Sequence, residues 1–160
     1  MARAVLDAEG REALTMRRLA EEVGIRAPSL YKHVRDKAAI EALLVEDALA
    51  EVGEALHATV ARPGPEGPVA ALLAAYRRAG LDHPHRYRLA TSGPLRRDLL
   101  PPGLEDWAGE PFLLAVGEPH RAQALWSLAH GMVILEIDGR YPPDSDLSLT
   151  WQAAATAFTP

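Results

Sequence analysis

The 160-residue sequence contains no cysteine, and this absence excludes several classes of protein. Without thiols the chain can form no disulfide framework, no cysteine-liganded zinc finger and no thiol nucleophile. A reducing compartment is the simplest setting for such a chain, so we expect a cytoplasmic location. No stretch approaches the ~18 uninterrupted apolar residues of a membrane-spanning helix. The N-terminal MARAVLDAEGRE also lacks the apolar core of a signal peptide. We therefore expect no membrane partner.

An overall excess of positive charge is missing as well. The net charge is −5, which argues against a protein that coats nucleic acid without regard to sequence. The charge is uneven, however. Residues 1–37 hold 8 Lys and Arg against 6 Asp and Glu, whereas residues 38–160 hold 9 against 16. A small basic region on an acidic body can still contact nucleic acid.

Strand patterns are scarce, so we expect an all-α fold class. Ala, Leu, Glu and Arg dominate, β-branched residues are few, and no stretch alternates apolar and polar residues. Gly and Pro divide the chain into successive helices, for which Thr15, Asp36 and a residue between Asp144 and Asp146 are the expected N-terminal caps. The expected helices cover residues 2–9, 16–23, 28–34, 37–60, 68–82, 85–92, 104–116, 119–138 and 146–158.

Residues 14–37 have the spacing of a helix-turn-helix. The small Ala20 lets two helices cross closely, Gly24 adopts the turn conformation, and Ile25 and Leu30 are expected to seal the angle between the helices. The second helix would then project and could enter the ~12 Å major groove. The residues expected on its exposed face are Arg26, Ala27, Ser29, Lys32 and His33, with Arg17, Arg35 and Lys37 at neighbouring turns. The alternative is that these cations only solvate a surface hairpin, but their combination with the turn spacing favours DNA binding.

The segment LTMRRLAEEVGIRAPSLYKHVRDKAAIEALL closely resembles the DNA-binding segment of tetracycline-repressor (TetR) family regulators, with nearly every pattern position matched from Leu14 to Lys37. The resemblance implies that Lys37 anchors the start of the next helix on DNA. It further implies phosphate contacts by Thr15, Arg17 and Tyr31, and base or backbone contacts by Ala27, Pro28, Ser29, Lys32 and His33. The Tyr31 ring could instead pack in the hairpin core while only its hydroxyl reaches out.

The later segment ALWSLAHGMVILEIDGRYPPDSDLSLTW is similar to the Trp-x3-His-Gly ligand-binding domain of one branch of that family, and supplies Trp126, His130 and Gly131. The resemblance implies an all-helical homodimer whose last two long helices form a four-helix bundle between subunits. Ligand binding would shift the two heads and release the operator. We expect Leu128, Leu135, Trp151 and Ala155 to supply the apolar surface of this bundle. The expected domains are a helix-turn-helix head at 1–36, a connecting helix at 37–60, and a ligand-binding and dimerisation domain at 61–160.

Two positions depart from the family pattern. Family members usually begin their first helix earlier, so Met1 would lie inside that helix. We expect either that residues encoded upstream extend it or that the head is unusually labile. Few apolar residues, Val5 and Leu6, are then left to hold the head together. Ala27 stands before Pro28 and offers neither a side-chain cap nor a hydrogen bond to a base.

Aromatic residues of the larger domain are the natural lining of an apolar cavity. Each of them is also a plausible core residue, and His130 could equally be a core histidine bonded to a neighbouring helix. No cluster of Lys or Arg accompanies them, which favours a small, mainly apolar effector with one or two polar atoms. The candidate ligand-binding residues are Tyr76, Tyr87, Trp107, Phe112, Trp126 and His130.

Other chemistry is poorly supported. The run Asp82-His83-Pro84-His85 is better explained as a solvent-facing turn than as a metal site, and Ser92 lacks the G-x-S-x-G elbow of a hydrolase. We therefore expect no enzyme, no metal and no cofactor. The sequence predicts a ligand-responsive regulator, most simply a repressor, that binds a near-palindromic double-stranded DNA operator as a homodimer. The alternative is a TetR-fold ligand-binding or interaction protein without operator binding.

Overall fold

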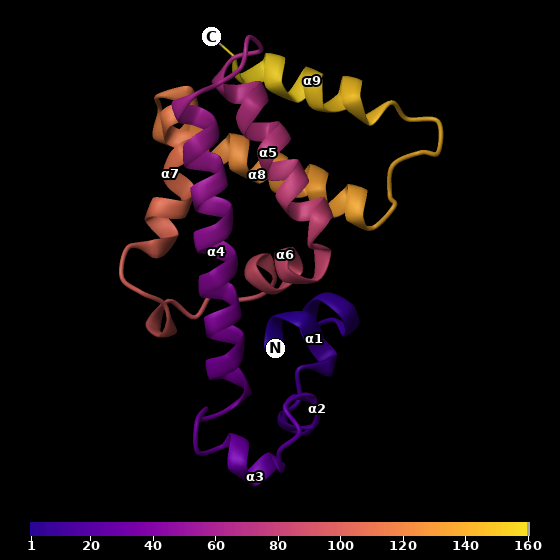
Figure 1. The fold of residues 1–160 in the computed structure, drawn as a ribbon. Helices are drawn as coiled ribbons and strands as arrows, with labels where there is room; N and C mark the ends of the chain where they lie inside the picture. The colour runs from indigo at the N-terminus through magenta and orange to yellow at the C-terminus, as the bar shows by residue number, and fades with distance from the viewer. Residues whose placement is uncertain (160) are drawn as a thin grey trace. The chain divides into compact units, whose positions relative to one another are not determined.

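The computed structural model describes residues 1–159, which contain helices and no strand (Figure 1). The all-α fold class expected from the sequence is confirmed. Each expected helix is present, most within one residue of its expected ends, because Gly and Pro interrupt the chain where they were expected to. None of the helices in these residues is long and apolar enough to cross a membrane. The elements are α1 (Ala2–Glu9), η1 (Arg11–Ala13), α2 (Met16–Glu22), α3 (Ala27–Leu30), α4 (Lys37–Ala61), α5 (Pro68–Asp82), α6 (Pro84–Thr91), η2 (Arg97–Leu99), α7 (Leu104–Val116), α8 (Pro119–Ile137) and α9 (Leu147–Phe158).

The chain forms two compact units. Unit 1 comprises Met1–Ala50 and His83–Leu104, and unit 2 comprises Glu51–Asp82 and the residues from Glu105 onward. The boundary after residue 50 falls inside α4, which is one continuous helix. The division differs from the expected domains in two respects, since residues 83–104 belong with the head and the connecting helix 37–60 is divided between the two units.

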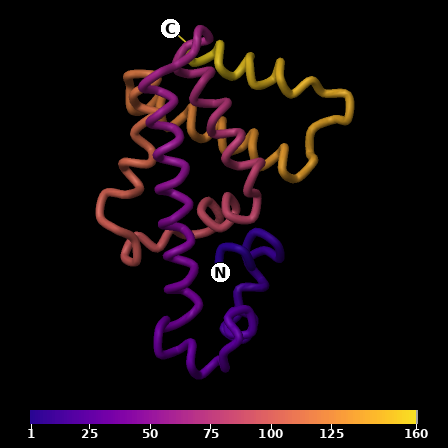
Figure 2. The backbone as a smooth tube through the Cα atoms, in the orientation of Figure 1, coloured from indigo at the N-terminus to yellow at the C-terminus, as the bar shows by residue number. Residues whose placement is uncertain are grey.

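Packing on α1 explains why α6 belongs to unit 1 (Figure 2). Leu89 of α6 is buried in the same apolar cluster as Val5 and Leu6 of α1. Arg86, only 6% exposed, donates from Nε to Asp7 Oδ1 at 2.9 Å. A buried cation is costly unless it is paired, so this contact ties the two helices together. The remaining buried members of the cluster are Leu14, Leu19, Ala20, Leu30, Ile40, Leu44 and Val45.

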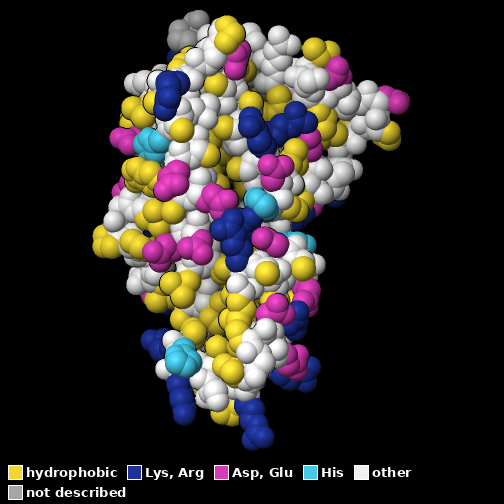
Figure 3. All heavy atoms as spheres, viewed as in Figure 1, with side chains coloured by type: hydrophobic (Ala, Val, Ile, Leu, Met, Phe, Trp, Pro, Cys, Tyr) yellow, Lys and Arg dark blue, Asp and Glu magenta, His cyan; other side chains and the backbone are white. Residues whose placement is uncertain are grey.

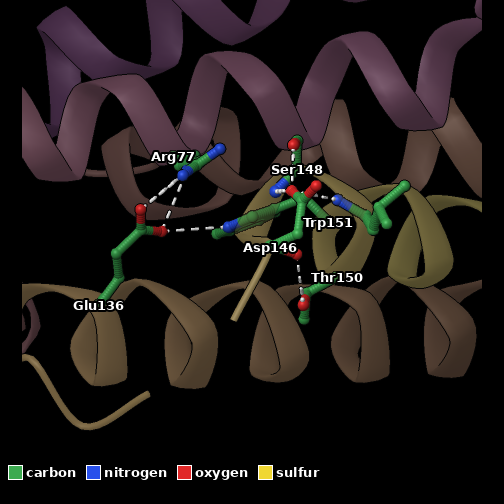
Figure 4. A network of polar contacts seen from close by, with 7 residues as sticks. Arg77, Glu136, Asp146, Ser148, Thr150 and Trp151 are labelled. Carbon is green, nitrogen blue, oxygen red and sulfur yellow. Dashed lines mark hydrogen bonds and ion pairs between the residues drawn. The ribbon is translucent and has the colours of Figure 1, made fainter. Parts of the chain in front are cut away.

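Unit 2 is built around α5, which contacts both α8 and α9. Glu136 of α8 joins these three helices (Figure 4). It accepts a hydrogen bond from Arg77 Nε of α5 at 3.0 Å and another from Trp151 Nε1 of α9 at 3.1 Å. The Arg77 guanidinium also lies 5.6 Å from the Trp151 ring centroid, a cation–π contact. One carboxylate therefore holds the N-terminal half of α9 against α5 and α8.

The second half of α4 packs against α7 through an indole ring, also within unit 2. A Cβ added at Gly53 would lie 2.5 Å from the Trp107 ring, so no larger residue fits there without a shift. On the next turn of α4, the His57 ring stacks on Trp107 with centroids 4.9 Å apart, and its Nε2 lies 2.9 Å from the Trp107 carbonyl oxygen. The glycine thus allows a close approach of α7 to α4.

Candidate DNA-binding site

The turn between α2 and α3 has helix-turn-helix geometry. Thr15 caps α2 by accepting a hydrogen bond from the Arg18 amide at 3.1 Å. Gly24 then takes a φ of +69°, a value that costs other residues free energy, and the Ile25 amide donates to the Ala20 carbonyl at 3.0 Å. Because this bond closes the turn, α3 leaves α2 at a fixed angle.

Burial at this turn agrees with the sequence at Ala20 and Leu30, which are 1% and 6% exposed. The expectation for Ile25 was wrong, because its side chain is 40% exposed and does not seal the angle between the helices. Leu19 of α2, 1% exposed, fills the core instead. The ring of Tyr31 is not packed in the hairpin core either, since the residue is 55% exposed.

The projecting helix is shorter than expected. Regular α3 ends at Leu30 rather than near residue 34, and Lys32 and His33 continue as turns closed by bonds to the Ser29 and Leu30 carbonyls. Arg26 precedes α3, and Pro28 lies in its first turn, where a missing amide proton costs nothing. Arg26, Pro28, Lys32 and His33 are exposed, while Ala27 and Ser29 are half-buried.

Lys and Arg side chains project at the end of unit 1 that α3 forms (Figure 3). The Arg17 side chain is 87% exposed, and its Nε lies 3.6 Å from Glu21 Oε1 in a loose ion pair. Arg18, by contrast, is bound by Glu9 at 2.6 Å and by Glu22 at 2.8 Å, so it links α1 to α2. The cations at this end are therefore of two kinds, those held in ion pairs within the fold and those that extend into solvent.

The start of α4 adds a cluster of opposite charges. The Asp36 carboxylate caps the helix, as the sequence predicts, by accepting from the Ala39 amide at 2.9 Å. This bond, with help from Arg35, holds the pKa of Asp36 below its ordinary value. Lys37 Nζ donates to the Arg11 carbonyl at 3.3 Å and lies 3.6 Å from Glu41 Oε1. The Arg11 guanidinium in turn binds both Glu41 oxygens, at 3.0 and 2.9 Å.

Two family profiles match the chain. "Bacterial regulatory proteins, tetR family" matches residues 1–42, and "Tetracyclin repressor-like, C-terminal domain" matches residues 69–158. The chain belongs to the TetR family. The second match alone extends over more than half of the sequence, so the resemblance seen in the motifs is confirmed at both ends.

The TetR relatives are regulators. An uncharacterised HTH-type transcriptional regulator of Mycobacterium tuberculosis, Rv0681, is 30% identical over 147 residues, covering 84% of this chain and 66% of that protein. The tetracycline repressor protein class E of Escherichia coli is 47% identical over 51 residues, 32% of this chain and 24% of the repressor. An HTH-type transcriptional regulator of Saccharopolyspora erythraea is 35% identical over 96 residues, 57% of this chain and 37% of that protein. The chain therefore spans 66% or less of the length of these relatives. The expectation that it is not an enzyme is confirmed by the regulators among its relatives.

Solved structures share the TetR fold seen here. A regulatory protein, SCO4313, superposes with a TM-score of 0.77 at 24% identity, covering 98% of this chain and 90% of that one. A protein of unknown function from Rhodococcus sp. RHA1 also superposes at 0.77, with 22% identity and coverages of 98% and 89%. At such identities the likeness concerns the fold alone.

The six aromatic and histidine residues predicted to bind a ligand in the TetR C-terminal domain do not gather at one place. Tyr76 of α5 and Phe112 of α7 are buried edge to face, with centroids 5.4 Å apart. Tyr87 of α6 is buried in unit 1, and Trp107 of α7 packs against Gly53 of α4. Trp126 is 47% exposed and stacks on the half-buried His130, with centroids 6.1 Å apart. Burial lowers the pKa of His130, and this shift favours the neutral ring.

The sequence did not predict the Arg11–Glu41 pair or the Arg77–Glu136 pair. A weak signal existed for Glu136, an acid near the end of a largely apolar helix. Arg11 and Glu41 are 30 positions apart, so no local pattern could pair them. Only the three-dimensional fold brings them together.

Proposed function

We propose that the protein is a ligand-responsive transcriptional repressor that binds a near-palindromic operator as a homodimer. The observation that carries this proposal is the helix-turn-helix, which presents Arg26, Lys32 and His33 to solvent while Arg18 stays bound to acids of the fold. Side chains on such a projecting element can read base edges in the major groove. Arg17 and Lys37 are placed at helix starts, where they would contact phosphates and fix the register.

The test is a selection from random double-stranded DNA, followed by gel shifts with the recovered sequences and with the DNA upstream of the protein's own gene. We expect a recovered site with two related half-sites, bound more weakly as salt rises. A specific site usually exceeds random DNA by ~10³ or more in affinity. If no sequence exceeds random DNA at ~100 mM salt, the proposal fails, and the TetR-fold ligand-binding protein without operator becomes the better reading.

The homodimer interface that we propose is the outward face of α8 and α9. Leu128 and Leu135 of α8 are 38% and 43% exposed, and Leu149 of α9 is 61% exposed. Gly131 lies between Leu128 and Leu135 on α8, although glycine inside a helix costs about 1 kcal/mol relative to alanine. A Cβ there would meet nothing within 4 Å in its own chain. Close approach of a partner helix would account for this glycine.

Two residues expected at this interface belong elsewhere. Trp151 and Ala155 are 7% and 6% exposed, because both face the interior of unit 2. Trp151 is bound to Glu136, so its substitution would disturb the fold of each subunit rather than a contact between subunits. The proposed bundle therefore uses the opposite side of α9.

For the effector we propose a small, mainly apolar molecule that acts within unit 2. The Tyr76–Phe112 contact joins α5 to α7, and a ligand inserted between these helices would separate the two rings. The resulting shift of α7 would move Trp107 against Gly53 of α4. Because α4 is continuous from Lys37 to Ala61, displacement there would extend toward the DNA-binding end of the helix.

Fluorescence provides the readout of this coupling. A true effector should change Trp107 emission and release the operator along the same titration. A ~100-fold loss of operator affinity requires about 2.7 kcal/mol of differential binding between the two conformations. A compound that changes the emission and raises the melting temperature but leaves the operator complex intact would contradict the coupling.

A further inference from the structure

The first turns of α4 contain a sheltered acid beside a proposed DNA contact. The Glu41 side chain is only 16% exposed, because Arg11 binds both of its oxygens and Lys37 lies over it. The Lys37 side chain is 40% exposed and the Arg11 side chain is 50% exposed. The two cations therefore lie on the solvent side of the carboxylate, and the cluster of three has a net charge of +1.

These contacts restrict the Lys37 ammonium. An ammonium group has three N–H donors, and a lysine side chain in solvent samples many rotamers. One donor is used by the Arg11 carbonyl at 3.3 Å, and a second faces Glu41 Oε1 at 3.6 Å. The third is left for an external acceptor. Restricting the side chain before binding lowers the entropy lost when it contacts a phosphate.

We propose that Glu41, held by Arg11, is a positioning residue for DNA binding, and that it fixes the Lys37 ammonium for contact with a backbone phosphate. This proposal rests on the proposed DNA-binding function. It assigns to an acidic residue a favourable role at an interface with a polyanion. Glu41 acts through Lys37 and does not itself contact DNA.

Simple charge counting predicts the opposite result. Removing an acid near DNA raises the local positive potential, so the variant should bind all DNA more tightly. Positioning predicts weaker binding, because a released lysine must be ordered again in the complex. The two explanations therefore differ in the sign of the effect of Glu41→Gln.

The experiment uses the full chain and the operator recovered by selection. We expect Glu41→Gln to weaken operator binding several-fold. We also expect it to reduce the salt slope by up to ~0.9 unit, the contribution of one phosphate contact. Glu41→Asp keeps the charge and shortens the side chain, so it should weaken binding as well, for geometric reasons only. Glu12→Gln is the matched control, because it removes the same charge next to Arg11 from an exposed side chain. It should bind as tightly as the wild type or more tightly.

A second background tests whether Glu41 acts through Lys37. In Lys37→Ala, the additional change Glu41→Gln should have little further effect on operator affinity. Circular dichroism melts confirm that the variants remain folded, and Glu41→Asp provides the result if Glu41→Gln does not fold. Tighter binding by Glu41→Gln, or an equal loss with and without Lys37, would overturn the positioning role. A wild-type protein that binds no operator would overturn the proposed function along with it, whereas normal wild-type binding with unaffected variants would refute the positioning role alone.

Discussion

Arg17 and Lys32 illustrate how cations on one small surface can have different tasks. Arg17 lies at the start of α2, where it would contact phosphate, and Lys32 lies just after α3, where it would reach bases. Phosphate contacts contribute to the affinity for every sequence, whereas base contacts distinguish sequences. The tasks are therefore separable by mutation.

We predict that Arg17→Ala weakens binding to operator and random DNA alike and lowers the salt slope by roughly one unit. Lys32→Ala should also alter the sequence preference recovered in a repeated selection. Arg62→Ala, an exposed cation beyond the end of α4, is the charge-matched control and should leave both properties unchanged. An Arg17→Ala protein with an unchanged salt slope would remove Arg17 from the interface.

The Glu41 cluster also predicts a dependence of stability on pH. Hydrogen bonds from Arg11, with smaller contributions from the charges of Arg11 and Lys37, hold the pKa of Glu41 below its ordinary value of 4.5. At a pH between the lowered pKa of the folded state and the ordinary pKa of the unfolded chain, the folded protein binds fewer protons at the Glu41 carboxylate than the unfolded chain does. Its contribution to the free energy of unfolding is therefore complete above the ordinary value and is lost as the pH falls through the folded value.

Urea unfolding at neutral pH and in acid measures this contribution. Several other acids, including Asp36 and Glu118, also have lowered pKa values, so both proteins should lose stability in acid. Glu41→Gln should lose less between the two pH values than the wild type, because its side chain cannot be protonated. Equal losses would mean that the ion pair contributes no net stability to the folded chain.

At the level of elements, the contact of α4 with α7 depends on a single missing side chain. A methyl group on Gly53 would lie 2.5 Å from the Trp107 ring. Alanine normally favours a helix over glycine by about 1 kcal/mol, but forcing an extra methyl into a packed contact typically costs 1–3 kcal/mol. The second effect should dominate here because the neighbour is a rigid ring.

We predict that Gly53→Ala lowers the free energy of unfolding and changes Trp107 emission. Gly109→Ala in α7 is the matched control, since a Cβ there would meet nothing within 4 Å. It should stabilise the protein by up to about 1 kcal/mol. Denaturant titrations of the two variants therefore ought to shift in opposite directions. A stabilised Gly53→Ala protein would show that the indole moves aside at little cost.

Helix boundaries were the part of the fold that local sequence predicted best. Proline, glycine and capping residues act within a few positions, so Thr15, Asp36 and Asp146 indicated helix starts without knowledge of the tertiary structure. The placement of α6 depends on Leu89 and Arg86 meeting α1 far away in the sequence, and no local pattern carries that information. The exposed Ile25 was mispredicted for the same reason.

The candidate sites were predictable to different degrees. The DNA-binding residues lie within one short motif, so their exposure follows largely from the turn at Gly24. The proposed ligand residues were predicted from residue type, and only Trp126 and His130 are also part of a family motif. The structure separates them, with Tyr87 in unit 1 and Trp126 on the surface of α8. Aromatic residues of a helical protein occur in the core, on the surface and in cavities, so residue type alone does not locate a cavity.

At the scale of the whole molecule, we predict a homodimer that forms through the outward face of α8 and α9. Replacing Leu135 or Leu149 with Glu should yield monomers, because each would place a charge in the apolar centre of the proposed bundle. Leu114→Glu is the matched control, since Leu114 of α7 is 58% exposed and lies outside this face. Sedimentation of the three variants checks the prediction. Intact dimers for both Leu135→Glu and Leu149→Glu would place the interface elsewhere.

Because the N-terminal core includes Leu89, its completion is delayed during translation. The helix that covers Val5 and Leu6 emerges from the ribosome only after some eighty further residues have been added. Until then α1 has an uncovered apolar side, of the kind that nascent-chain chaperones bind. The same arrangement bears on domain grafting. A fragment that ends with α4 lacks both Leu89 and the partner of Asp7, so a transplanted DNA-binding module would need to retain the α6 segment to keep its core closed.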